Sequence, residues 1–504
     1  MSARGRALGL GASVKPFQIF NTLTRTVEEF RPLDAGPSPE VTFYSCGPTV
    51  YLPQHLGNMR AYVFVDTLRR ALEFNGYRVR HVMNITDVGH MTSDEDAGED
   101  KVEKTARAEG KTPIEVANFY IAQFKRDCAL LNIELPPDAN VDELPHPPQS
   151  ALCRATDNVP AMVSVIERII AHGYAYVTPS GVYFDVEKWR GPSGMGRLSR
   201  QSLDEQHAGQ RLEHSSDKHS PHDFALWVLN SPHHMMQWPS PWGRGYPGWH
   251  IECSAMSMKY LGETIDIHSG GLDHIPVHHE NEIAQSESAS GHPFVRYFVH
   301  NAFLTGMAGA KISKSAGKFP VLGDLSKAGI VNPLAFRLFC FGAKYRSELV
   351  FSLEAVRAAE KNYYYLRQFG FQIDDSLADS KEDSPWVEPF REKFHEAIND
   401  DLNTPQALAV ALEMVNKAYR DHDHRVWNTL KKFDDVLGLG LEDRRTQGRE
   451  WNEAAEILAR QRQEARLARD FAKADELREA LEAMGWIVED TRESPSGYRL
   501  KKRQ

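Results

Sequence analysis

Two histidines and two glutamates stand close together in the stretch "VHHENEIAQ" at residues 277–285. His278 and Glu282 are four positions apart, so on a helix their side chains project from one face about one turn apart. Such a pair can give one imidazole nitrogen and one carboxylate oxygen to a single metal ion. Taken alone, the stretch is more typical of a polar helix start, so a metal site here requires ligands from elsewhere in the chain.

The cysteines are the first candidates for those further ligands. Cys46 lies in a β-rich run at 41–51, and Cys253 lies in the stretch "HIEC". Two sulfurs, one imidazole and one carboxylate would suit zinc, which accepts mixed ligands in tetrahedral geometry. The five cysteines are too scattered for a disulfide-stapled secreted domain, and we interpret the other three as buried apolar thiols: Cys128, Cys153 and Cys340.

His279 is an alternative ligand, one position further along the same helix. Its bond vector turns about 100° away from the row that holds Glu282, which favours a role behind the ligands. With two thiolates and one carboxylate, a zinc cluster would carry a net charge of about −1, which a buried site tolerates poorly. We expect hydrogen bonds from nearby histidines to offset this charge, namely from His250, His268 and His279.

Two further motifs suggest that a nucleotide binds. In "PQHLGNMRA" (53–61), His55 and Gly57 stand at a turn that enters a helix, where a glycine lets a phosphate or base approach the backbone. In "GMAGAKISKSAGK" (306–318), two lysines lie in a glycine-flanked loop that could close over a triphosphate. Each motif alone also fits an ordinary helix start or a solvated basic loop, but the two together reinforce the nucleotide interpretation.

The HxGN motif followed far downstream by KISKS resembles the paired signatures of class I aminoacyl-tRNA synthetases. The stretches "SPWGRGYPGWHIECSAM" (240–256) and "DIHSGGLDHIPVHHENEIAQSE" (266–287) are similar to the cysteinyl-tRNA synthetase family almost residue for residue. So are "FNTLTRTVEEFRPL" (20–33), "YSCGPTVY" (44–51), "RATDNVPAMVSVIERIIAHGYAY" (154–176), "DFALW" (223–227) and "DDLNTPQALAV" (400–410). The resemblance therefore spans nearly the whole chain.

The resemblance implies a reaction and a set of roles. ATP, with Mg²⁺ on its phosphates, and L-cysteine would give cysteinyl-adenylate, and the cysteinyl group would then pass to the terminal adenosine of tRNA(Cys). The implied ATP-binding residues are His55, Gly57, Asn58 and Lys314, and the implied catalytic residues are His55, Asn58, Lys311 and Lys314. The implied substrate-binding residues are Thr49, Thr86, Trp249 and Asp273. One Zn²⁺ per chain would be held by Cys46, Cys253, His278 and Glu282.

Zinc would also explain how such an enzyme separates cysteine from serine. A bound zinc takes a thiolate as an added ligand, whereas an alcohol stays protonated and ligates poorly. We therefore expect no editing site. The sequence departs from the family pattern at Ile312, which replaces the usual methionine, and in the long acidic segment 88–100, to which we assign no role.

The elements that must position these residues follow from hydrophobic periodicity. A strand beginning at 41, a helix at 55–74 and a strand at 77–86 open a parallel α/β unit. The fold class we predict is α/β, with a Rossmann-like parallel-sheet catalytic domain, an inserted connective segment, a C-terminal helical bundle and a small terminal α/β tail. We expect the two halves of the catalytic domain at 14–133 and 241–305, with the insertion between them at 134–240. The KxSKS loop and stem-contact region should follow at 306–350. The anticodon-binding bundle should occupy 351–450, and the tail 451–504.

Other elements follow in the same way. The insertion should contain a helix at 159–172 and a hairpin at 174–186, and a strand at 297–303 should return to the catalytic core. One charged helix at 452–484 and a hairpin at 485–500 should end the chain. Basic residues that could follow tRNA phosphates are Arg460, Arg462, Arg466, Arg469, Lys501, Lys502 and Arg503. Ion pairs on a solvated helix, such as Arg466 with Asp470, explain any single arginine equally well.

Composition sets the remaining limits. The 504 residues carry a formal charge of −10 and contain no run of eighteen apolar residues, so we expect a soluble, cytoplasmic monomer with no membrane segment. Two alternatives remain. A mycothiol-pathway cysteine ligase would share the catalytic fold and zinc motif but lack the long C-terminal part. A non-catalytic RNA-binding paralogue would be expected to have damaged HxGN or KxSKS motifs.

Overall fold

The computed structural model describes the chain from residue 15 to residue 502, with gaps. The residues between these limits that it leaves undescribed are 89–99, 140–149, 190–193, 203–204, 206–216, 233, 307–319, 372–382, 443–454, 456–457, 464, 484–485 and 492–497. Lys311, Ile312, Lys314 and Arg503 therefore lie outside the described residues, as do most of the acidic segment 88–100 and the polar stretch 376–382.

A five-stranded, fully parallel sheet forms the centre of the molecule. Its strands lie in the order β11 (Val295–Asn301), β10 (Ile265–Gly271), β3 (Glu40–Ser45), β4 (Arg78–Ile85) and β5 (Ala151–Arg154). The chain builds outward from β3 to β4 and β5, and then starts again on the other side with β10 and β11. This order confirms the Rossmann-like prediction, and the point where it reverses, between β3 and β10, is where such sheets bind ligands.

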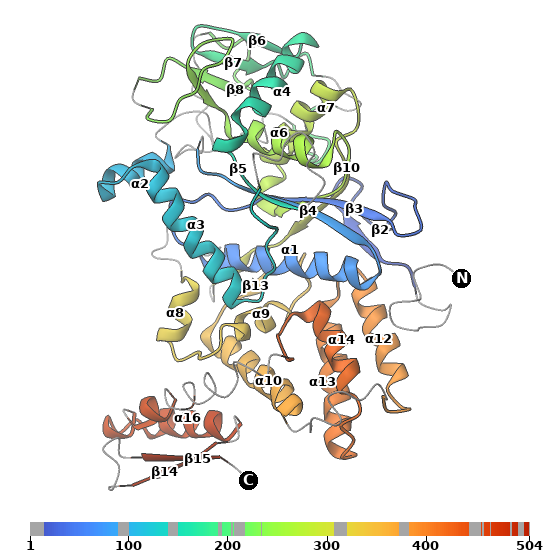
Figure 1. Cartoon of the computed structure of the whole chain (residues 1–504), viewed down its shortest axis with the longest axis vertical. Coiled ribbons are helices and arrows are strands. Elements are labelled where there is room, and N and C mark those ends of the chain that lie inside the picture. Colours follow the sequence, from blue (N-terminus) through green and yellow to red (C-terminus); the bar gives the residue numbers. More distant parts are fainter. Residues whose placement is uncertain are drawn as a thin grey trace.

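Helices cover both faces of this sheet. In Figure 1, α1 (Leu56–Phe74) lies below the sheet and α6 (Trp249–Leu261) above it, with α4 (Val159–Ala171) and α7 (His278–Ser290) packed beside α6. Helix α1 begins after His55 and ends before Gly76, whose φ of 84° a side chain would disfavour. The helices predicted at 55–74 and 159–172 are confirmed.

The inserted segment forms a second, antiparallel sheet above the first. Its order is β6 (Ala175–Val177), β7 (Gly181–Phe184), β8 (Phe224–Leu229) and β9 (Gly245–Pro247), which confirms the predicted hairpin at 174–186. Both ends of the expected insertion at 134–240 differ from the structure, since β9 of this sheet lies at 245–247, within the range 241–305 that we expected to belong to the second catalytic half. Residues 151–154 form β5 and pair in parallel with β4, because their buried side chains extend the catalytic sheet by one strand.

The remaining elements of the catalytic half frame the sheet. These are the hairpin β1 (Gln18–Asn21) and β2 (Thr26–Glu29), the helices α2 (Lys101–Glu109) and α3 (Pro113–Leu130), the single turns η3 (Thr156–Asn158) and η4 (Leu272–His274), and the short parallel pair β12 (Leu304–Thr305) and β13 (Leu349–Val350). Cys128, Cys153 and Cys340 are free and buried, as predicted.

The C-terminal part is helical, as predicted. It contains α8 (Leu322–Lys327), α9 (Leu334–Cys340), α10 (Leu353–Phe371), α12 (Glu388–Asn399), α13 (Thr404–Arg420) and α14 (Trp427–Leu437), and then α16 (Phe471–Ala483) with the hairpin β14 (Trp486–Asp490) and β15 (Tyr498–Lys502). In Figure 1, α12, α13 and α14 stand below α1. Within the described residues, none of the helices has the length and apolar character needed to cross a membrane.

The single helix predicted at 452–484 is wrong. The chain turns at residues 468–470, where Arg469 has a φ of 60°, and α16 starts afresh at Phe471. Asp470 caps the new helix by accepting a hydrogen bond from the Lys473 amide at 3.1 Å. Arg462 and Arg466 pair with Asp490 of β14, so the suggested pair of Arg466 with Asp470 is also wrong.

Candidate metal centre

The backbone at the end of β3 fixes the position of Cys46. Its amide donates a hydrogen bond of 3.1 Å to the Ser269 carbonyl of β10, so the thiol lies at the reversal point of the sheet. Gly47 follows, and a Cβ there would lie 1.7 Å from the Asn84 carbonyl oxygen. Only glycine allows this close approach of β3 to β4, so the glycine after the cysteine is required by packing.

The four predicted ligands meet in one place. One ligand atom from each of Cys46, Cys253, His278 and Glu282 lies within 4.8 Å of all the others. Cys253 comes from α6, and His278 and Glu282 come from the first turns of α7, which packs against α6. Three elements that are distant in sequence therefore direct two sulfurs, one nitrogen and one oxygen toward a common centre.

The Glu282 carboxylate tests whether this centre suits a cation. Its Oε2 lies 2.8 Å from His268 Nε2 in a hydrogen bond. Its Oε1 lies 3.0 Å from His278 Nε2, yet this buried oxygen has no hydrogen bond among the described residues. A fully buried carboxylate oxygen without a partner is costly. Because the neighbouring groups are also typical zinc ligands, the residues fit a bound zinc ion.

Three histidines stand behind three of the four ligands. His279 Nε2 lies 3.4 Å from the Cys46 sulfur, and His250 Nδ1 lies 2.8 Å from His278 Nδ1. The contact of His268 with Glu282 completes the set. These are the histidines expected to offset the charge of the cluster, and each one contacts a different ligand.

A fourth histidine, His300 of β11, extends this arrangement. Its Nε2 lies 2.7 Å from His279 Nδ1, and its Nδ1 lies 2.8 Å from the Thr22 hydroxyl. Burial, followed by the neighbouring histidines, lowers the pKa of both His279 and His300 well below the usual value. Both rings are therefore neutral, and each has one donor and one acceptor nitrogen. If Cys46 is a thiolate, the Thr22 hydroxyl donates to His300, His300 donates to His279, and His279 donates to the sulfur.

A second set of possible ligands shares part of the same space. Cys46, His268, His279 and Glu282 also present ligand atoms within 4.8 Å of one another. In this set both His279 nitrogens already have partners, one toward Cys46 and one toward His300. His278 likewise directs one nitrogen at His250 and the other at Glu282, so each histidine has one nitrogen held by a neighbouring histidine and one directed at a candidate ligand.

Electrostatics also favour a cation at this centre. Burial, and then the neighbouring Cys253, raise the pKa of the Cys46 thiol well above its usual value, and Glu282 raises it further. A thiolate at Cys46 therefore requires a positive charge beside it. Apart from burial, the described groups that raise the pKa of Cys46 most are ones that carry a negative charge when ionised.

The residues predicted around the substrate lie close to the cluster. The ring of Trp249 stacks on that of His278, with centroids 4.3 Å apart and an interplanar angle of 24°. Thr49 and Thr86 form a bridge between the ends of β3 and β4, and the Thr86 hydroxyl accepts a hydrogen bond of 3.0 Å from Asn84 Nδ2. Asp273, in η4 after β10, adds to the rise in the pKa of Cys46.

The predicted nucleotide-binding turn lies at the start of α1. His55 caps the helix, with its Nδ1 accepting a hydrogen bond of 3.2 Å from the Asn58 amide. A Cβ on Gly57 would lie 3.0 Å from the His55 ring, which explains the glycine. Leu56 donates to the Pro320 carbonyl at 2.9 Å. Residues that directly follow the segment of Lys311 and Lys314 therefore contact the start of α1.

Sequence reasoning missed two buried groups at this site, His300 and Glu252. Glu252 is fully buried, close to Cys253 and Thr86. Burial raises the pKa of Glu252 well above its usual value. The available signals were a charged residue inside the apolar stretch "WHIECSAM" and a histidine on the predicted strand 297–303.

Three family models match the chain in succession. The model of the class I (C) tRNA synthetase catalytic domain matches residues 33–361, a DALR domain matches 393–442, and the anticodon-binding domain of cysteinyl-tRNA ligase matches 449–499. The first of these covers more than half of the chain.

Curated relatives match over nearly their full length. A cysteine–tRNA ligase 1 of Burkholderia lata is 44% identical over 493 residues, which cover 96% of this chain and 97% of the relative. A cysteine–tRNA ligase of Treponema denticola is 41% identical and covers 94% of this chain and 97% of its own. A cysteine–tRNA ligase of Chlorobaculum tepidum is 40% identical, and the match covers 96% of this chain and 99% of the relative.

Solved structures support the fold at much lower sequence identity. Mycobacterium tuberculosis methionyl-tRNA synthetase in complex with methionyl-adenylate superposes with a TM-score of 0.53 at 14% identity, over 84% of this chain and 93% of that chain. The ternary complex of Agrobacterium radiobacter K84 agnB2 LeuRS, tRNA and LeuAMS gives a TM-score of 0.54 at 11% identity, over 84% and 86%.

Proposed function

Because this chain belongs to the cysteine–tRNA ligase family of class I tRNA synthetases, we propose that it activates L-cysteine with ATP and attaches it to tRNA(Cys). A cysteine carboxylate oxygen attacks the α-phosphorus of ATP, giving cysteinyl-adenylate and pyrophosphate. The 2′-hydroxyl of the terminal tRNA adenosine then attacks the carbonyl carbon, and AMP leaves. The observation that carries this proposal is the meeting of Cys46, Cys253, His278 and Glu282 beside the nucleotide-binding turn.

These four residues would hold one Zn²⁺. When bound, the ion would stabilise the substrate thiolate as an added ligand and would leave the hydroxyl of serine protonated and weakly bound. Within the described residues Glu282 Oε1 has no hydrogen bond, which supports a cation at this centre. We prefer these four residues to the set that contains His279 because they are the set that the family resemblance implies.

The histidines behind the ligands would manage charge and orientation. His279 Nε2 donates to the Cys46 sulfur, while His300 and Thr22 hold the other side of its ring. His268 donates to Glu282, and His250 fixes the ring of His278. Each of these bonds stabilises negative charge on a ligand or keeps an imidazole nitrogen directed at the centre.

The nucleotide would lie against the start of α1. His55 and Asn58 stand at this turn, Gly57 gives close access to the triphosphate, which would carry Mg²⁺, and the helix N-terminus favours its negative charge. Lys314, with Lys311, would stabilise the charge that develops as pyrophosphate leaves. Trp249 would form a wall of the cysteine pocket, and polar contacts to cysteine and adenosine would come from Thr49, Thr86 and Asp273.

The C-terminal part decides between this function and its alternatives. A mycothiol-pathway ligase would lack the segments that match the DALR and anticodon-binding models, which favours tRNA as the acceptor. A non-catalytic RNA-binding paralogue would not need the intact turn at His55, Gly57 and Asn58. A monomeric state and a cytoplasmic location remain part of the proposal.

The test combines metal content with two activities. The purified chain should exchange pyrophosphate into ATP with cysteine but not with serine, and it should charge tRNA(Cys). Cys253→Ser should lose zinc and exchange together, while Cys153→Ser, a buried cysteine outside the cluster, should keep both. A wild-type chain that lacks zinc, or a Cys253→Ser variant that keeps full zinc and exchange, would contradict the assignment.

A further inference from the structure

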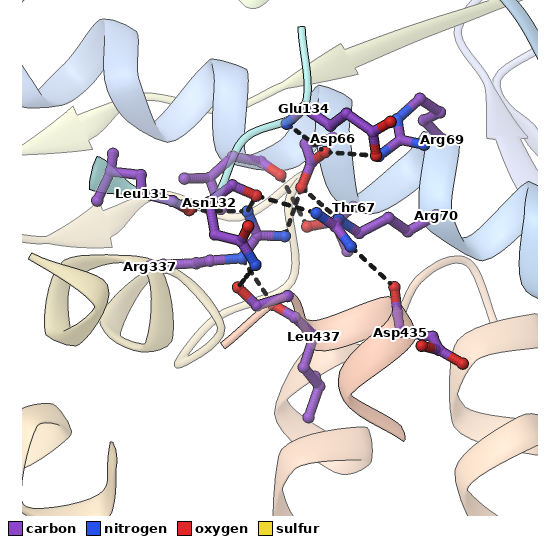
Figure 2. Close-up of polar contacts among 12 residues, drawn as sticks. Asp66, Thr67, Arg69, Arg70, Leu131, Asn132, Glu134, Arg337, Asp435 and Leu437 are labelled. Atoms are coloured by element: carbon purple, nitrogen blue, oxygen red, sulfur yellow. Dashed lines mark hydrogen bonds and ion pairs between the residues drawn. The ribbon is translucent and has the colours of Figure 1, made fainter. Parts of the chain in front are cut away.

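A second buried polar cluster lies on α1, on the side away from the metal centre. Asp66 is buried and accepts four hydrogen bonds (Figure 2). Its Oδ1 accepts from Arg69 Nη2 at 3.0 Å and from the Glu134 amide at 3.1 Å. Its Oδ2 accepts from Arg70 Nε at 2.7 Å and from Arg337 Nη2 at 2.6 Å. One carboxylate thus organises three guanidinium groups.

Two of these arginines continue into the helical bundle. Arg337 of α9 donates at 2.6 Å to the Leu437 carbonyl at the end of α14, and Arg70 donates at 3.2 Å to the Asp435 carbonyl. Both also donate to the Asn132 carbonyl, at 3.1 Å and 3.0 Å. The cluster therefore fastens α1 and the end of α3 to α14, which lies within the DALR match (Figure 2).

Arg69 offers a contrast within the same cluster. Besides Asp66 it binds Glu73 at 2.7 Å and Glu134 at 2.8 Å, and both partners belong to the catalytic half. Within the described residues, Arg69 makes no hydrogen bond or ion pair with α14. Two adjacent arginines on one helix thus share a carboxylate but differ in whether they reach the bundle.

Helix α1 also carries the residues that contact the nucleotide in the proposed function. His55, Gly57 and Asn58 form its first turn, about 14 Å along the axis from Asp66 at 1.5 Å per residue. Arg60 of α1 binds the Ala302 and Phe303 carbonyls, just before β12, at 3.0 Å and 2.5 Å. A change in how α1 meets the bundle would therefore alter the angle between the nucleotide end and any tRNA held by the bundle.

We propose that Arg70, Asp66 and Arg337 are positioning residues for the second step, because they set the orientation of the DALR bundle relative to α1. This proposal rests on the proposed function. Cysteine activation needs only the catalytic half, so it does not depend on this joint. Transfer needs tRNA bound to the bundle while its 3′ end reaches the adenylate, so it depends on the fraction of molecules in which the two parts are correctly oriented.

The test compares Arg70→Gln with Arg69→Gln in the full-length chain. Both changes remove one positive charge from neighbouring positions of α1, and Arg69 has the larger number of carboxylate partners. For Arg70→Gln we expect kcat/KM for tRNA(Cys) to fall on the order of tenfold, because the variant loses the hydrogen bonds that the charged guanidinium of Arg70 donates. Pyrophosphate exchange with cysteine should stay at the wild-type rate. Arg69→Gln should leave the ratio of charging to exchange unchanged, and Arg70→Lys should restore part of the loss.

A change from the bundle side provides an independent variant. Gly438 follows α14 with a φ of 63°, and a Cβ there would lie 2.5 Å from Arg337 Nη2. Gly438→Ala should lower the same ratio, and combining it with Arg70→Gln should cost less than the product of the two effects, since both loosen one joint.

Three results would contradict the proposal that these residues orient the bundle. These are an unchanged ratio in Arg70→Gln, an equal fall in Arg69→Gln, and fully multiplicative effects of Arg70→Gln and Gly438→Ala. A wild-type chain with no cysteine-dependent exchange would instead overturn the proposed function, and the two failures are therefore distinguishable.

Discussion

The clusters around Glu282 and around Asp66 are both buried carboxylate sites, yet they are built from opposite kinds of base. Glu282 is surrounded by histidines and thiols, and in the described part of the chain His268, His278 and His279 are the basic groups within 4 Å of it. Asp66 is surrounded by three arginines. Arginine is charged at any accessible pH, whereas a buried histidine is neutral and can serve as a ligand or pass on a hydrogen bond.

The two carboxylates also differ in how completely their oxygens are hydrogen-bonded. Both oxygens of Asp66 accept two hydrogen bonds each. Among the described residues, Glu282 Oε1 and His268 Nδ1 have no hydrogen bond. A carboxylate whose oxygens both accept hydrogen bonds from the protein holds elements together, while one that leaves a buried oxygen without a hydrogen bond is suited to a ligand. We therefore interpret Asp66 as a structural carboxylate and propose Glu282 as a metal ligand.

The largest expected effect is on the unsatisfied cluster. Glu282→Gln keeps the shape of the side chain but removes one anionic ligand, and it places an amide beside His268 or the metal. We expect zinc affinity and cysteine-dependent pyrophosphate exchange to fall by more than about a hundredfold, beyond the usual cost of changing a group behind a ligand. Metal analysis and exchange assays on one preparation test this. A variant that retains zinc and normal exchange would show that Glu282 is not a ligand.

The satisfied cluster should respond through stability. Asp66→Asn leaves Arg337 buried without its counter-charge, which should cost about 3–5 kcal/mol at pH 7. Burial alone would raise the pKa of Asp66, but Arg337, Arg70 and Arg69 together lower it well below its usual value. The stability that Asp66 contributes is therefore complete above the unfolded pKa, and it is lost as pH falls through the folded pKa.

Urea unfolding of the wild type and of Asp66→Asn at several pH values would measure this effect. The difference between the two midpoints should be large at pH 7 and should shrink as the solution becomes acidic below about pH 4. A difference that does not vary with pH would mean that the charge of Asp66 does not stabilise the fold.

The sequence predicted the functional cluster better than the structural one. Cys46, Cys253, His278 and Glu282 stand in short motifs with distinctive residue types, so their meeting could be expected before any coordinates. Asp66 and Arg337 are 271 positions apart and lie in ordinary amphipathic helices. Nothing in the local pattern of either helix indicates that the two side chains meet, because the pairing depends on how α1, α9 and α14 pack.

The C-terminal helix shows a second limit of sequence reasoning. The charged pattern from 452 to 484 is continuous, so periodicity indicates one helix, whereas the chain turns at Arg469. The signal that was available is Asp470, a good helix-capping residue directly before Phe471. A cap inside a periodic run is easily taken for a surface carboxylate, since both look alike in sequence. Strand β5 was also missed, because it follows a proline-rich stretch that reads as a linker, and nothing in that stretch indicates that β5 pairs with the sheet.

A smaller effect is expected from the histidines behind the ligands. Replacing His250, His268 and His279 together by glutamine should weaken cysteine binding by about 10- to 100-fold, while zinc stays bound through its own ligands. The glutamine amide has donors and an acceptor, but it does not fix them at the two ring positions through which His279 links Cys46 to His300. Measurement of the cysteine KM in pyrophosphate exchange, with zinc content as the control, tests this. Unchanged cysteine affinity would mean that these histidines do not compensate the charge of the cluster.

The smallest effect concerns Asp434, which lies near the arginines of the Asp66 cluster but should titrate in the opposite sense. Burial raises the pKa of Asp434 to about 6, although it accepts hydrogen bonds from the Leu441 and Leu439 amides and lies near Arg337. Since the folded pKa is above the unfolded one, its stabilising contribution is present below about pH 4 and is lost as pH rises through about 6. Asp434→Asn should therefore gain stability relative to the wild type between pH 4 and pH 7, by up to a few kcal/mol. Urea midpoints over this range, measured beside those of Asp66→Asn, should give pH slopes of opposite sign. Equal signs would mean that Asp434, like Asp66, is held ionised by the arginines.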